Sequence, residues 1–328
     1  MAYKVLLAQD VAQSGKDLLK KNGFEIVLAG DENLQTIQSL IEDCDAVFSK
    51  TLFLNESVLR AGKKLKVVAK HGVGVDNVVD VGTATRLGLY VVNTPLANME
   101  SVAEHTMAAV LALSKNVVRM NIAARNNDFD APLRILAQEV KGKTIGIIGL
   151  GNIGRSVAKK AKMGFEMNVL GFDPYVKADI VPDYVTVETD INEIFRKADF
   201  VSLHLGASDE TKGLVNKERL ELMKSSAYFV NFARGALVVE SDLVETLRNK
   251  RIRGAALDVF ADEPVRSDNP LLQLDNVLVS PHSAALSVEA LDNMSYQGAM
   301  GIVEVFTGKR PRWCVNYDDV NGRGNTNV

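Results

Sequence analysis

Short apolar runs alternate along this chain with longer amphipathic stretches. Each run has the length of a β-strand, and the stretches between them have the periodicity of helices. In chain order the runs are KVLLAQ, EIVLAG, DAVFSK, KVVAKHG and LYVVNT, followed by TIGIIG, NVLGFD, VTVE, FVSLHL, AYFVNFA, GAALDV and NVLVS. Nearly all-apolar strands are typical of parallel sheets buried on both faces. The pattern therefore predicts an α/β protein with two doubly wound parallel-sheet domains, the first of them flavodoxin-like.

The alternation falls into two units, and a length of 328 residues fits two domains. The first five runs lie within residues 1–97, and the other seven lie within residues 98–285. A last helical stretch, Ser287 to Thr307, comes after the second unit. We predict that it returns to the first unit, which makes a discontinuous domain of residues 1–97 and 286–328 around an inserted domain of residues 98–285.

One long helix is expected from Ser101 to Arg125. Ser101 and Glu104 have the spacing of a capping box, and the apolar positions that follow outnumber what one helix face needs. Such a helix belongs between domains or in a subunit contact. Residues 126–141 are irregular but carry Leu133 and Leu136, so we expect an arm that packs on a partner subunit.

Three glycines with the spacing G-x-G-x-x-G follow the run TIGIIG. Gly149 allows a tight turn, Gly151 lets a pyrophosphate approach the backbone, and Gly154 lets the next helix pack on the strand. Free N–H groups at the N-terminus of that helix favour phosphates. Asp173 ends the following strand, where a carboxylate accepts both ribose hydroxyls of an adenosine and repels a 2'-phosphate. These features predict a Rossmann domain that binds NAD, although an ordinary βα turn is the alternative reading of the glycines.

A second glycine-rich loop follows the run KVVAK. It reads from His71 to Asn77, with glycines at positions 72 and 74. Successive N–H groups in such a loop converge on an anion, and ligands of open α/β sheets bind beyond the carboxyl ends of the strands. The sequence of this loop by itself fits an anion-binding site and a glycine-rich turn without a ligand equally well.

Three later strand ends carry groups suited to proton transfer. Arg234 follows AYFVNFA, Asp258 and Glu263 follow GAAL, and His282 follows NVLVSP. Histidine transfers protons near neutral pH, a neighbouring carboxylate orients it, and a guanidinium holds a carboxylate or polarises a carbonyl. Together these groups could move a proton alongside a hydride. Each residue taken singly has an alternative interpretation: Arg234 as a surface cation, Glu263 as a solvated loop carboxylate and His282 as a core histidine.

Composition narrows the classes of function. The net charge of −3 gives no reason to expect nucleic acid or an anionic membrane as a partner. Two cysteines far apart in sequence, and a first strand that begins at Lys4, predict a cytoplasmic protein without disulfides. No histidines, cysteines or carboxylates have metal-ligand spacing, so no catalytic metal is expected. His105 is expected to be structural, and His204 to pack near the cofactor.

The motifs together resemble those of the D-isomer-specific 2-hydroxyacid dehydrogenases, in their phosphoglycerate dehydrogenase-like branch. They are HGVGVDNV, VVNTP, SVAEH, GLGNIG with Asp173, NFARGALV, ALDVFADEP and SPHSA, and the resemblance covers Lys4 to Val315. It implies a split substrate-binding domain, an inserted NAD-binding domain and homodimers joined through the NAD domain. It also implies a D-2-hydroxy acid or 2-oxo acid as the small-molecule substrate.

Roles implied by the resemblance extend to particular residues. The catalytic set is Arg234, Glu263 and His282. Cofactor binding is implied for Gly149, Gly151, Asn152, Ile153, Gly154, Asp173, His204, Phe232, Ala233, Arg234, Asp258, His282 and Ala285. Substrate binding is implied for Lys50, Lys70, His71, Val73, Gly74 and Arg234, with the N–H groups of Val73 and Gly74 on the carboxylate.

Three departures from the family pattern leave the substrate open. The family's P-H-I-G-G is Pro281–Ala285, PHSAA, here, and a proline of the family is Gly206. Phosphoglycerate dehydrogenases carry arginines where this chain has Lys50 and Lys70, and lysine lacks the guanidinium fork. Because the two lysines still favour a substrate with an anionic tail, a phosphoglycerate dehydrogenase is favoured. A glyoxylate or hydroxypyruvate reductase, an aliphatic D-2-hydroxyacid dehydrogenase and an NAD-sensing corepressor are the alternatives.

Overall fold

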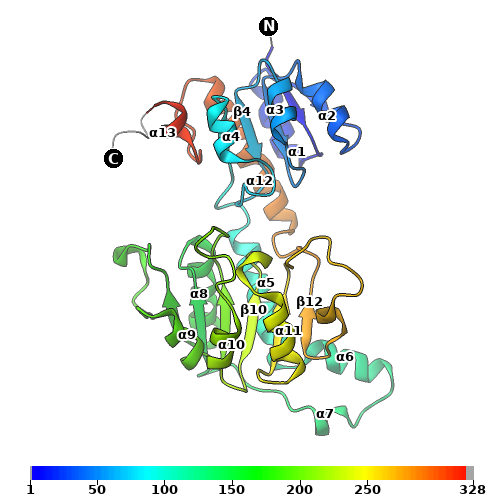
Figure 1. Cartoon of the computed structure of the whole chain (residues 1–328), viewed down its shortest axis with the longest axis vertical. Helices are drawn as coiled ribbons and strands as arrows, with labels where there is room; N and C mark the ends of the chain where they lie inside the picture. The colour runs from blue at the N-terminus through cyan, green and yellow to red at the C-terminus, as the bar shows by residue number, and fades with distance from the viewer. Residues whose placement is uncertain (1, 323–328) are drawn as a thin grey trace. The chain divides into compact units, whose positions relative to one another are not determined.

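The computed structural model describes residues 2–322, which form two compact units (Figure 1). Unit 1 comprises Met1–Asn98 and Leu286–Val328, and unit 2 comprises Met99–Ala285. Each unit contains one parallel sheet with helices on both faces, so the predicted fold class is confirmed. None of the helices within residues 2–322 combines the length and apolarity needed to cross a lipid bilayer.

Unit 1 has a five-stranded sheet. Its strands are β1 (Lys4–Leu7), β2 (Glu25–Leu28), β3 (Ala46–Ser49), β4 (Val67–Lys70) and β5 (Tyr90–Val92). They pair in the order β2-β1-β3-β4-β5, and every pair is parallel. This is the flavodoxin-like order, in which the strand order reverses between β1 and β3.

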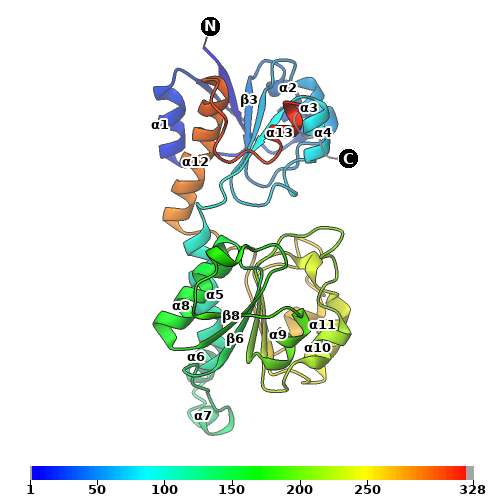
Figure 2. The same cartoon turned by 90° about the vertical axis from the view of Figure 1, so that its left-hand side faces the viewer.

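Helices cover both faces of this sheet. They are α1 (Gln13–Lys21), α2 (Leu34–Ile41), α3 (Glu56–Ala61), α4 (Val81–Arg86), α12 (Val288–Phe306) and the short α13 (Tyr317–Val320). Figure 2 shows α1 and α12 on one side of β3 and α2, α3 and α4 on the other. Alternate residues of β1 serve the two faces: Val5 and Leu7 pack with Ile302 of α12, and Leu6 packs with Ile37 of α2. The late helix α12 is therefore part of the core of the first unit.

Side-chain caps explain where several of these helices begin. Asn33, Asn55, Asp80 and Ser287 accept hydrogen bonds from backbone N–H groups in the first turns of α2, α3, α4 and α12. Such caps satisfy N–H groups that no helical carbonyl reaches.

Gly298 of α12 packs against β3 so closely that an added Cβ would overlap the ring of Phe48. We expect Gly298→Ala to lower the free energy of unfolding by about 1–3 kcal/mol, although alanine favours helices, because overpacking forces neighbours to move. The midpoint of thermal unfolding measures this. Gly164→Ala is the control, because a Cβ there meets nothing within 4 Å. A Gly298→Ala protein as stable as the wild type would contradict this packing.

Unit 2 has a seven-stranded sheet. Its strands are β6 (Thr144–Ile148), β7 (Asn168–Phe172), β8 (Val185–Val187), β9 (Phe200–Leu203), β10 (Tyr228–Asn231), β11 (Gly254–Leu257) and β12 (Val277–Val279). They pair in parallel in the order β12-β11-β10-β9-β6-β7-β8. The first six strands of this unit thus have the Rossmann order, with the reversal between β6 and β9.

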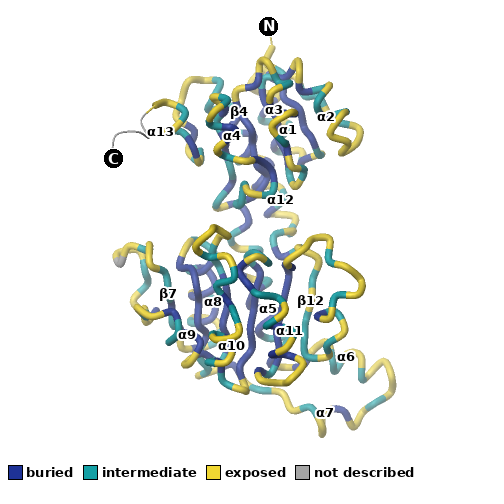
Figure 3. Tube along the Cα trace, viewed as in Figure 1, coloured by how far each residue is buried: buried dark blue, intermediate teal, exposed yellow. Residues whose placement is uncertain are grey.

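The faces of this second sheet are also covered. One core includes residues of α5 (Met99–Ser114) and α8 (Asn152–Phe165), and the other includes residues of α9 (Ile191–Lys197), α10 (Lys217–Leu222) and α11 (Glu240–Arg248). Short 3₁₀ helices lie at Ala178–Ile180, Gly235–Leu237 and Pro270–Gln273. The central strands of both sheets are buried, shown in dark blue in Figure 3.

The single helix predicted from Ser101 to Arg125 is wrong. The chain forms α5, which ends at Ser114, and a separate α6 (Val117–Arg125), because Asn116 adopts a left-handed conformation with φ 54°. Asparagine tolerates this conformation better than most residues. The predicted capping box is wrong too: Ser101 lies inside α5, and its hydroxyl donates to the Ala284 carbonyl at 2.8 Å.

The segment after α6 contains one short helix, α7 (Ala131–Arg134), and is otherwise irregular. Phe129, Leu133 and Leu136 are 74%, 79% and 70% exposed, whereas Val140 is buried. Large apolar side chains left this exposed are typical of surfaces that another molecule covers.

Candidate active site

The three predicted catalytic residues follow three neighbouring strands of unit 2. Arg234, Glu263 and His282 come after β10, β11 and β12, which lie side by side in the sheet. Because the carboxyl ends of parallel strands meet at one edge, all three residues lie at that edge.

Glu263 and His282 are in direct contact. His282 Nδ1 lies 2.7 Å from Glu263 Oε2, and the Phe260 N–H donates to Glu263 Oε1 at 3.0 Å. Burial by itself would raise the pKa of Glu263. The hydrogen bonds from His282 and Phe260 and the positive charges of His282 and Arg234 outweigh burial and lower this pKa below its ordinary value. Glu263 is therefore ionised at neutral pH and fixes Nδ1 as the protonated nitrogen of the ring, so Nε2 carries out any exchange of protons.

A buried carboxylate holds the loop that carries His282. Asp258 is 1% exposed, and its oxygens accept hydrogen bonds from the Ser280 hydroxyl at 2.6 Å and from the Ser283 and Ala284 N–H groups at 2.8 Å. The His282 N–H donates to the Asp258 carbonyl at 2.8 Å, and His282 has φ 50°. These bonds keep His282 in a left-handed conformation that non-glycine residues seldom adopt.

The resemblance implied a cofactor contact for Asp258, but the hydrogen bonds by which Asp258 holds the His282 loop were not predicted. The available signal was a carboxylate at the end of a buried strand together with the two serines that flank Pro281-His282. Short polar side chains beside a buried carboxylate are natural hydrogen-bond donors to it.

Arg234 lies in a turn that is pressed against the Glu263 loop. A Cβ at Gly235 would overlap the carbonyl of Phe260, so only glycine lets these two loops approach. The guanidinium of Arg234 donates to the Ala233 carbonyl at 2.8 Å, and the side chain of Asn231 donates to the Arg234 carbonyl at 2.9 Å. The turn therefore brings a fixed positive charge close to the Glu263 carboxylate.

The glycine motif adopts the geometry that dinucleotide binding requires. Gly149 has φ 98°, and a Cβ there would lie 2.5 Å from the carbonyl oxygen of His204. A Cβ at Gly154 would overlap the Gly149 carbonyl, whereas one at Gly151 would meet nothing within 4 Å. The turn is thus tight at the first glycine, closely packed at the third and open at the second.

The groups around this turn suit a dinucleotide. Within residues 2–322, the N–H groups of Asn152, Ile153 and Gly154 have no acceptor, and they begin α8 at the point where the strand order reverses. Asp173 accepts from the Leu150 and Tyr175 N–H groups, each at 2.9 Å, so its carboxylate is fixed beside the turn. The motif therefore fits NAD, with N–H groups for the pyrophosphate and a carboxylate for the ribose.

The other predicted cofactor residues lie nearby in the same unit. His204 Nε2 lies 2.8 Å from the Ser202 hydroxyl, and burial lowers the pKa of His204 to about 4, so it is neutral. Phe232 makes an edge-to-face contact with His105 at 5.1 Å. The Ala233 N–H donates to Asn231, and Ala285 packs at the edge of the core. Their contacts with a cofactor stay predictions.

In unit 1 the loop after β4 leaves two N–H groups available. Within the described residues, the N–H groups of Val73 and Gly74 have no acceptor, while Asn93 donates to the Val73 carbonyl at 2.7 Å. His71 is buried, and its Nε2 lies 3.1 Å from the Ser295 hydroxyl of α12. The geometry suits a carboxylate on the two N–H groups, and His71 anchors the start of the loop.

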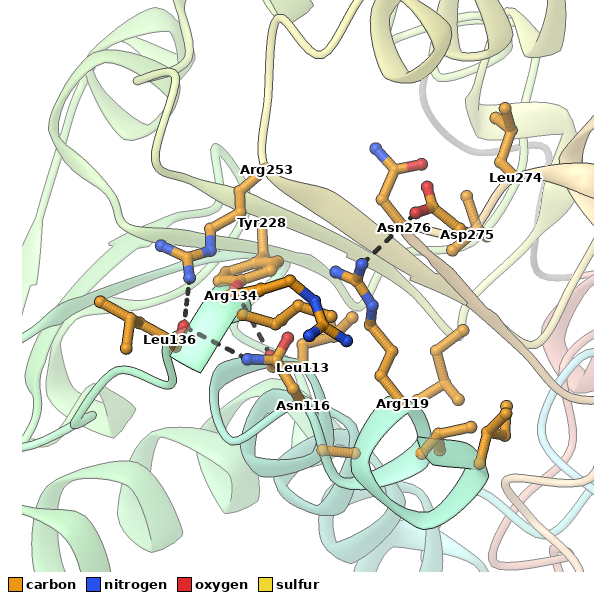
Figure 4. Close-up of a pocket in the computed structure, with 16 residues that line it drawn as sticks. Leu113, Asn116, Arg119, Arg134, Leu136, Tyr228, Arg253, Leu274, Asp275 and Asn276 are labelled. Carbon is orange, nitrogen blue, oxygen red and sulfur yellow. Dashed lines mark hydrogen bonds and ion pairs between the residues drawn. The ribbon is translucent and has the colours of Figure 1, made fainter. Parts of the chain in front are cut away.

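A cavity of about 450 Å³ lies in unit 2, away from the sheet edge that carries Arg234, Glu263 and His282 (Figure 4). It is lined by residues of α5, α6 and the segment after it, and by Tyr228, Arg253 and Asn276 near the starts of β10, β11 and β12. Arg253 and Asn116 both donate to the Leu136 carbonyl, at 2.7 and 3.3 Å, and so tie the exposed segment to the sheet.

Comparisons with known proteins identify similar chains. The family model described as D-isomer specific 2-hydroxyacid dehydrogenase, NAD binding domain, matches residues 107–284. The chain is 37% identical over 319 residues to the D-3-phosphoglycerate dehydrogenase of Methanocaldococcus jannaschii, which covers 97% of this chain and 60% of that relative. It is 34% identical over 330 residues to the glyoxylate reductase of Korarchaeum cryptofilum, which covers 98% of both chains.

A solved structure agrees over nearly the whole length. The TT0316 protein from Thermus thermophilus matches with a TM-score of 0.86 and 32% identity, over 95% of this chain and 99% of that one. By contrast, the chain spans 60% of the length of the D-3-phosphoglycerate dehydrogenases of Methanocaldococcus jannaschii and Archaeoglobus fulgidus.

Proposed function

Because the chain belongs to the family of D-isomer-specific 2-hydroxyacid dehydrogenases, we propose that it interconverts a D-2-hydroxy acid and its 2-oxo acid with NAD. The observation that carries this proposal is the contact of 2.7 Å between His282 and Glu263 at a strand end of a dinucleotide-binding unit. An imidazole paired with a carboxylate at such an edge can act as a general acid–base.

When NADH is bound, it supplies the hydride for C2 of the 2-oxo acid. His282 gives a proton from Nε2 to the carbonyl oxygen, and in the reverse direction Nε2 takes the proton of the hydroxyl group. Glu263 stabilises the imidazolium and keeps its orientation, since its two oxygens are held by His282 and by the Phe260 N–H. Arg234 polarises the carbonyl and attracts the carboxylate of the substrate.

For unit 1 we propose that the N–H groups of Val73 and Gly74 bind a substrate carboxylate, and that Lys50, Lys70 and His71 belong to the same substrate site. The acceptor-free N–H groups support this role. Among substrates we favour phosphohydroxypyruvate, on the two lysines and on the relatives named D-3-phosphoglycerate dehydrogenase. Hydroxypyruvate and glyoxylate are the second choice, on the relative named glyoxylate reductase.

Oxidation of NADH with a panel of 2-oxo acids tests this proposal directly. The panel contains phosphohydroxypyruvate, hydroxypyruvate, glyoxylate and a bulky aliphatic 2-oxo acid. Turnover of any of them supports the dehydrogenase, and their ranking selects the substrate. Absence of turnover with all four would count against the proposed activity.

Asp173 is expected to set the preference for NADH over NADPH. Its carboxylate lies beside the glycine turn, where it would repel a 2'-phosphate. We expect Asp173→Asn, which keeps an acceptor oxygen but removes the charge, to raise kcat/KM for NADPH relative to NADH by about tenfold. Asp275→Asn, at an exposed site before β12, is the control that should not change this ratio. Equal use of the two cofactors by the wild type would contradict the assignment.

Our proposal also includes a homodimer joined through unit 2, in the cytoplasm. The exposed Phe129, Leu133 and Leu136 support such an interface, because their burial by a second copy would remove apolar surface from water.

A further inference from the structure

The loop that carries Glu263 lies largely in solvent. It joins β11 to the 3₁₀ helix Pro270–Gln273, and most of its residues from Ala261 to Asp268 are exposed. The hydrogen bond of 2.7 Å to His282 nevertheless requires the Glu263 carboxylate to stay in one place. Since an exposed loop with few buried apolar contacts opens readily, the contacts that fix this loop decide how often the two side chains meet.

Glu240 binds this loop on both sides of Glu263. Its Oε2 accepts from the Ala261 N–H at 3.0 Å, and its Oε1 accepts from the side chain of Asn269 at 2.7 Å. The other end of the Asn269 amide, its Oδ1, accepts from the Leu271 N–H at 2.9 Å. The two ends of the loop are thus held by one carboxylate.

The backbone that carries Glu240 is itself fixed. Glu240 is the first residue of α11 and comes shortly after the turn of Arg234. The segment between them is bound to Val215, whose N–H donates to the Leu237 carbonyl at 2.8 Å and whose carbonyl accepts from the Val239 N–H at 2.9 Å. Arg234 and Glu240 therefore lie at the two ends of one anchored segment.

Stabilisation of α11 is the simpler explanation for a glutamate at this position. A carboxylate in the first turn of a helix interacts favourably with the free N–H groups of that helix. Asp242 lies in the same turn and can provide this interaction. Both oxygens of Glu240, by contrast, accept hydrogen bonds from donors in the Glu263 loop. Glu240 therefore acts on the loop and not only on the end of its own helix.

We infer that Glu240 is a positioning residue for the reaction, because it holds the loop so that Glu263 stays in hydrogen-bond contact with His282. The role requires no contact between Glu240 and the substrate or NADH. Phe260 supports the same geometry, since its N–H donates to Glu263 Oε1 at 3.0 Å and its carbonyl lies against Gly235. A displacement of about 1 Å at a catalytic site can lower turnover about a hundredfold. This inference rests on the proposed function and adds a residue that acts through Glu263.

Glu240→Ala tests the inference by releasing the loop. We expect kcat with the best 2-oxo acid of the panel to fall about tenfold, while Kd for NADH changes by less than about twofold. Glu245→Ala, which removes an exposed carboxylate from the same helix, is the control and should keep the kcat of the wild type. Glu240→Gln keeps an acceptor oxygen for the Ala261 N–H and should recover part of the loss.

A double-mutant cycle separates positioning from a general loss of structure. In a Glu263→Gln protein the carboxylate that Glu240 positions is already absent, so adding Glu240→Ala should lower kcat by no more than about twofold. An equal loss of kcat in both backgrounds would overturn the inference.

Asn269→Asp releases the loop by a second route. The aspartate keeps an oxygen for the Leu271 N–H but places a second carboxylate against Glu240, and the two like charges repel. This nearly isosteric change should reproduce the kcat of Glu240→Ala.

Proton NMR of the histidines gives a measurement that needs no turnover. The chain has four histidines, so the imidazole C–H signals are few, and the spectrum of His282→Asn identifies the signal of His282. At neutral pH this signal should move in Glu240→Ala in the same direction as in Glu263→Gln, and it should not move in Glu245→Ala. If no 2-oxo acid is reduced but the signal moves in this way, the dehydrogenase fails and the positioning role stands. A His282 signal unchanged in Glu240→Ala would refute the positioning role itself.

Discussion

Replacing His282 by asparagine is expected to lower kcat by about two to four orders of magnitude, the usual contribution of a general acid–base. Among the described residues, His282 is the imidazole that contacts Glu263, and its Nε2 is left to face a substrate. Without it, the carbonyl oxygen of the 2-oxo acid has no positioned proton donor as hydride arrives. Steady-state kinetics with NADH and the best 2-oxo acid of the panel measures the loss.

Asparagine is a better test than alanine, because residue 282 has φ 50°. Asparagine tolerates the left-handed region, whereas alanine adds strain to the loop. His282→Ala should show the same loss of kcat together with lower stability. NADH binding should be retained in His282→Asn, which shows that the unit is intact. If His282→Asn keeps kcat within tenfold of the wild type, the general acid–base is another group.

Acidification is expected to destabilise unit 1 by about 3 kcal/mol through His71 alone. Burial, followed by the positive charges of Lys50 and Lys70, lowers the pKa of His71 from 6.5 to about 4. Between these pH values His71 is protonated in the unfolded chain but not in the folded chain, so the free energy of unfolding falls as pH falls. The contribution of the neutral His71 is complete above pH 6.5 and is lost progressively toward pH 4, at about 1.4 kcal/mol per pH unit.

Urea unfolding at pH 7 and pH 5 measures this effect, and Trp313 is a fluorescent probe within unit 1 because it is the single tryptophan of the chain. His71→Gln removes the titrating group, so its unfolding free energy should depend less on pH, by about 2 kcal/mol over this interval. Ile302→Val, a core change in the same unit, should lower stability equally at both pH values. An unchanged pH dependence in His71→Gln would mean that His71 takes up its proton in the folded state.

How far the sequence predicts the fold is clearest in the strands. All twelve apolar runs form strands, because a run of apolar residues bounded by glycines and polar residues is a local signal. The break at Asn116 was not predictable in this way. Apolar residues continue on both sides of it, and the left-handed turn depends on contacts such as the hydrogen bond from Asn116 to the Leu136 carbonyl, twenty residues away.

The candidate site shows the same division. The strand ends of Arg234, Glu263 and His282 could be read from the sequence, and the parallel sheet then brings them to one edge. The bonds from Ser280, Ser283 and Ala284 to Asp258 could not be read. Serine next to a histidine is common, and only the packing of β11 beside β12 makes a buried carboxylate its acceptor.

Reading the chain locally was enough to find the alternation of strands and helices, the glycine turn with its acidic partner, and the residue types at the strand ends. These features follow from side-chain periodicity and from backbone freedom over a few residues. Three other features required the folded chain: Gln9 accepts a hydrogen bond from the Lys50 N–H, His71 is buried and neutral, and the His282 N–H donates to the Asp258 carbonyl. Each of these depends on the order in which strands pair, which brings together groups that are distant along the chain and sets their hydration.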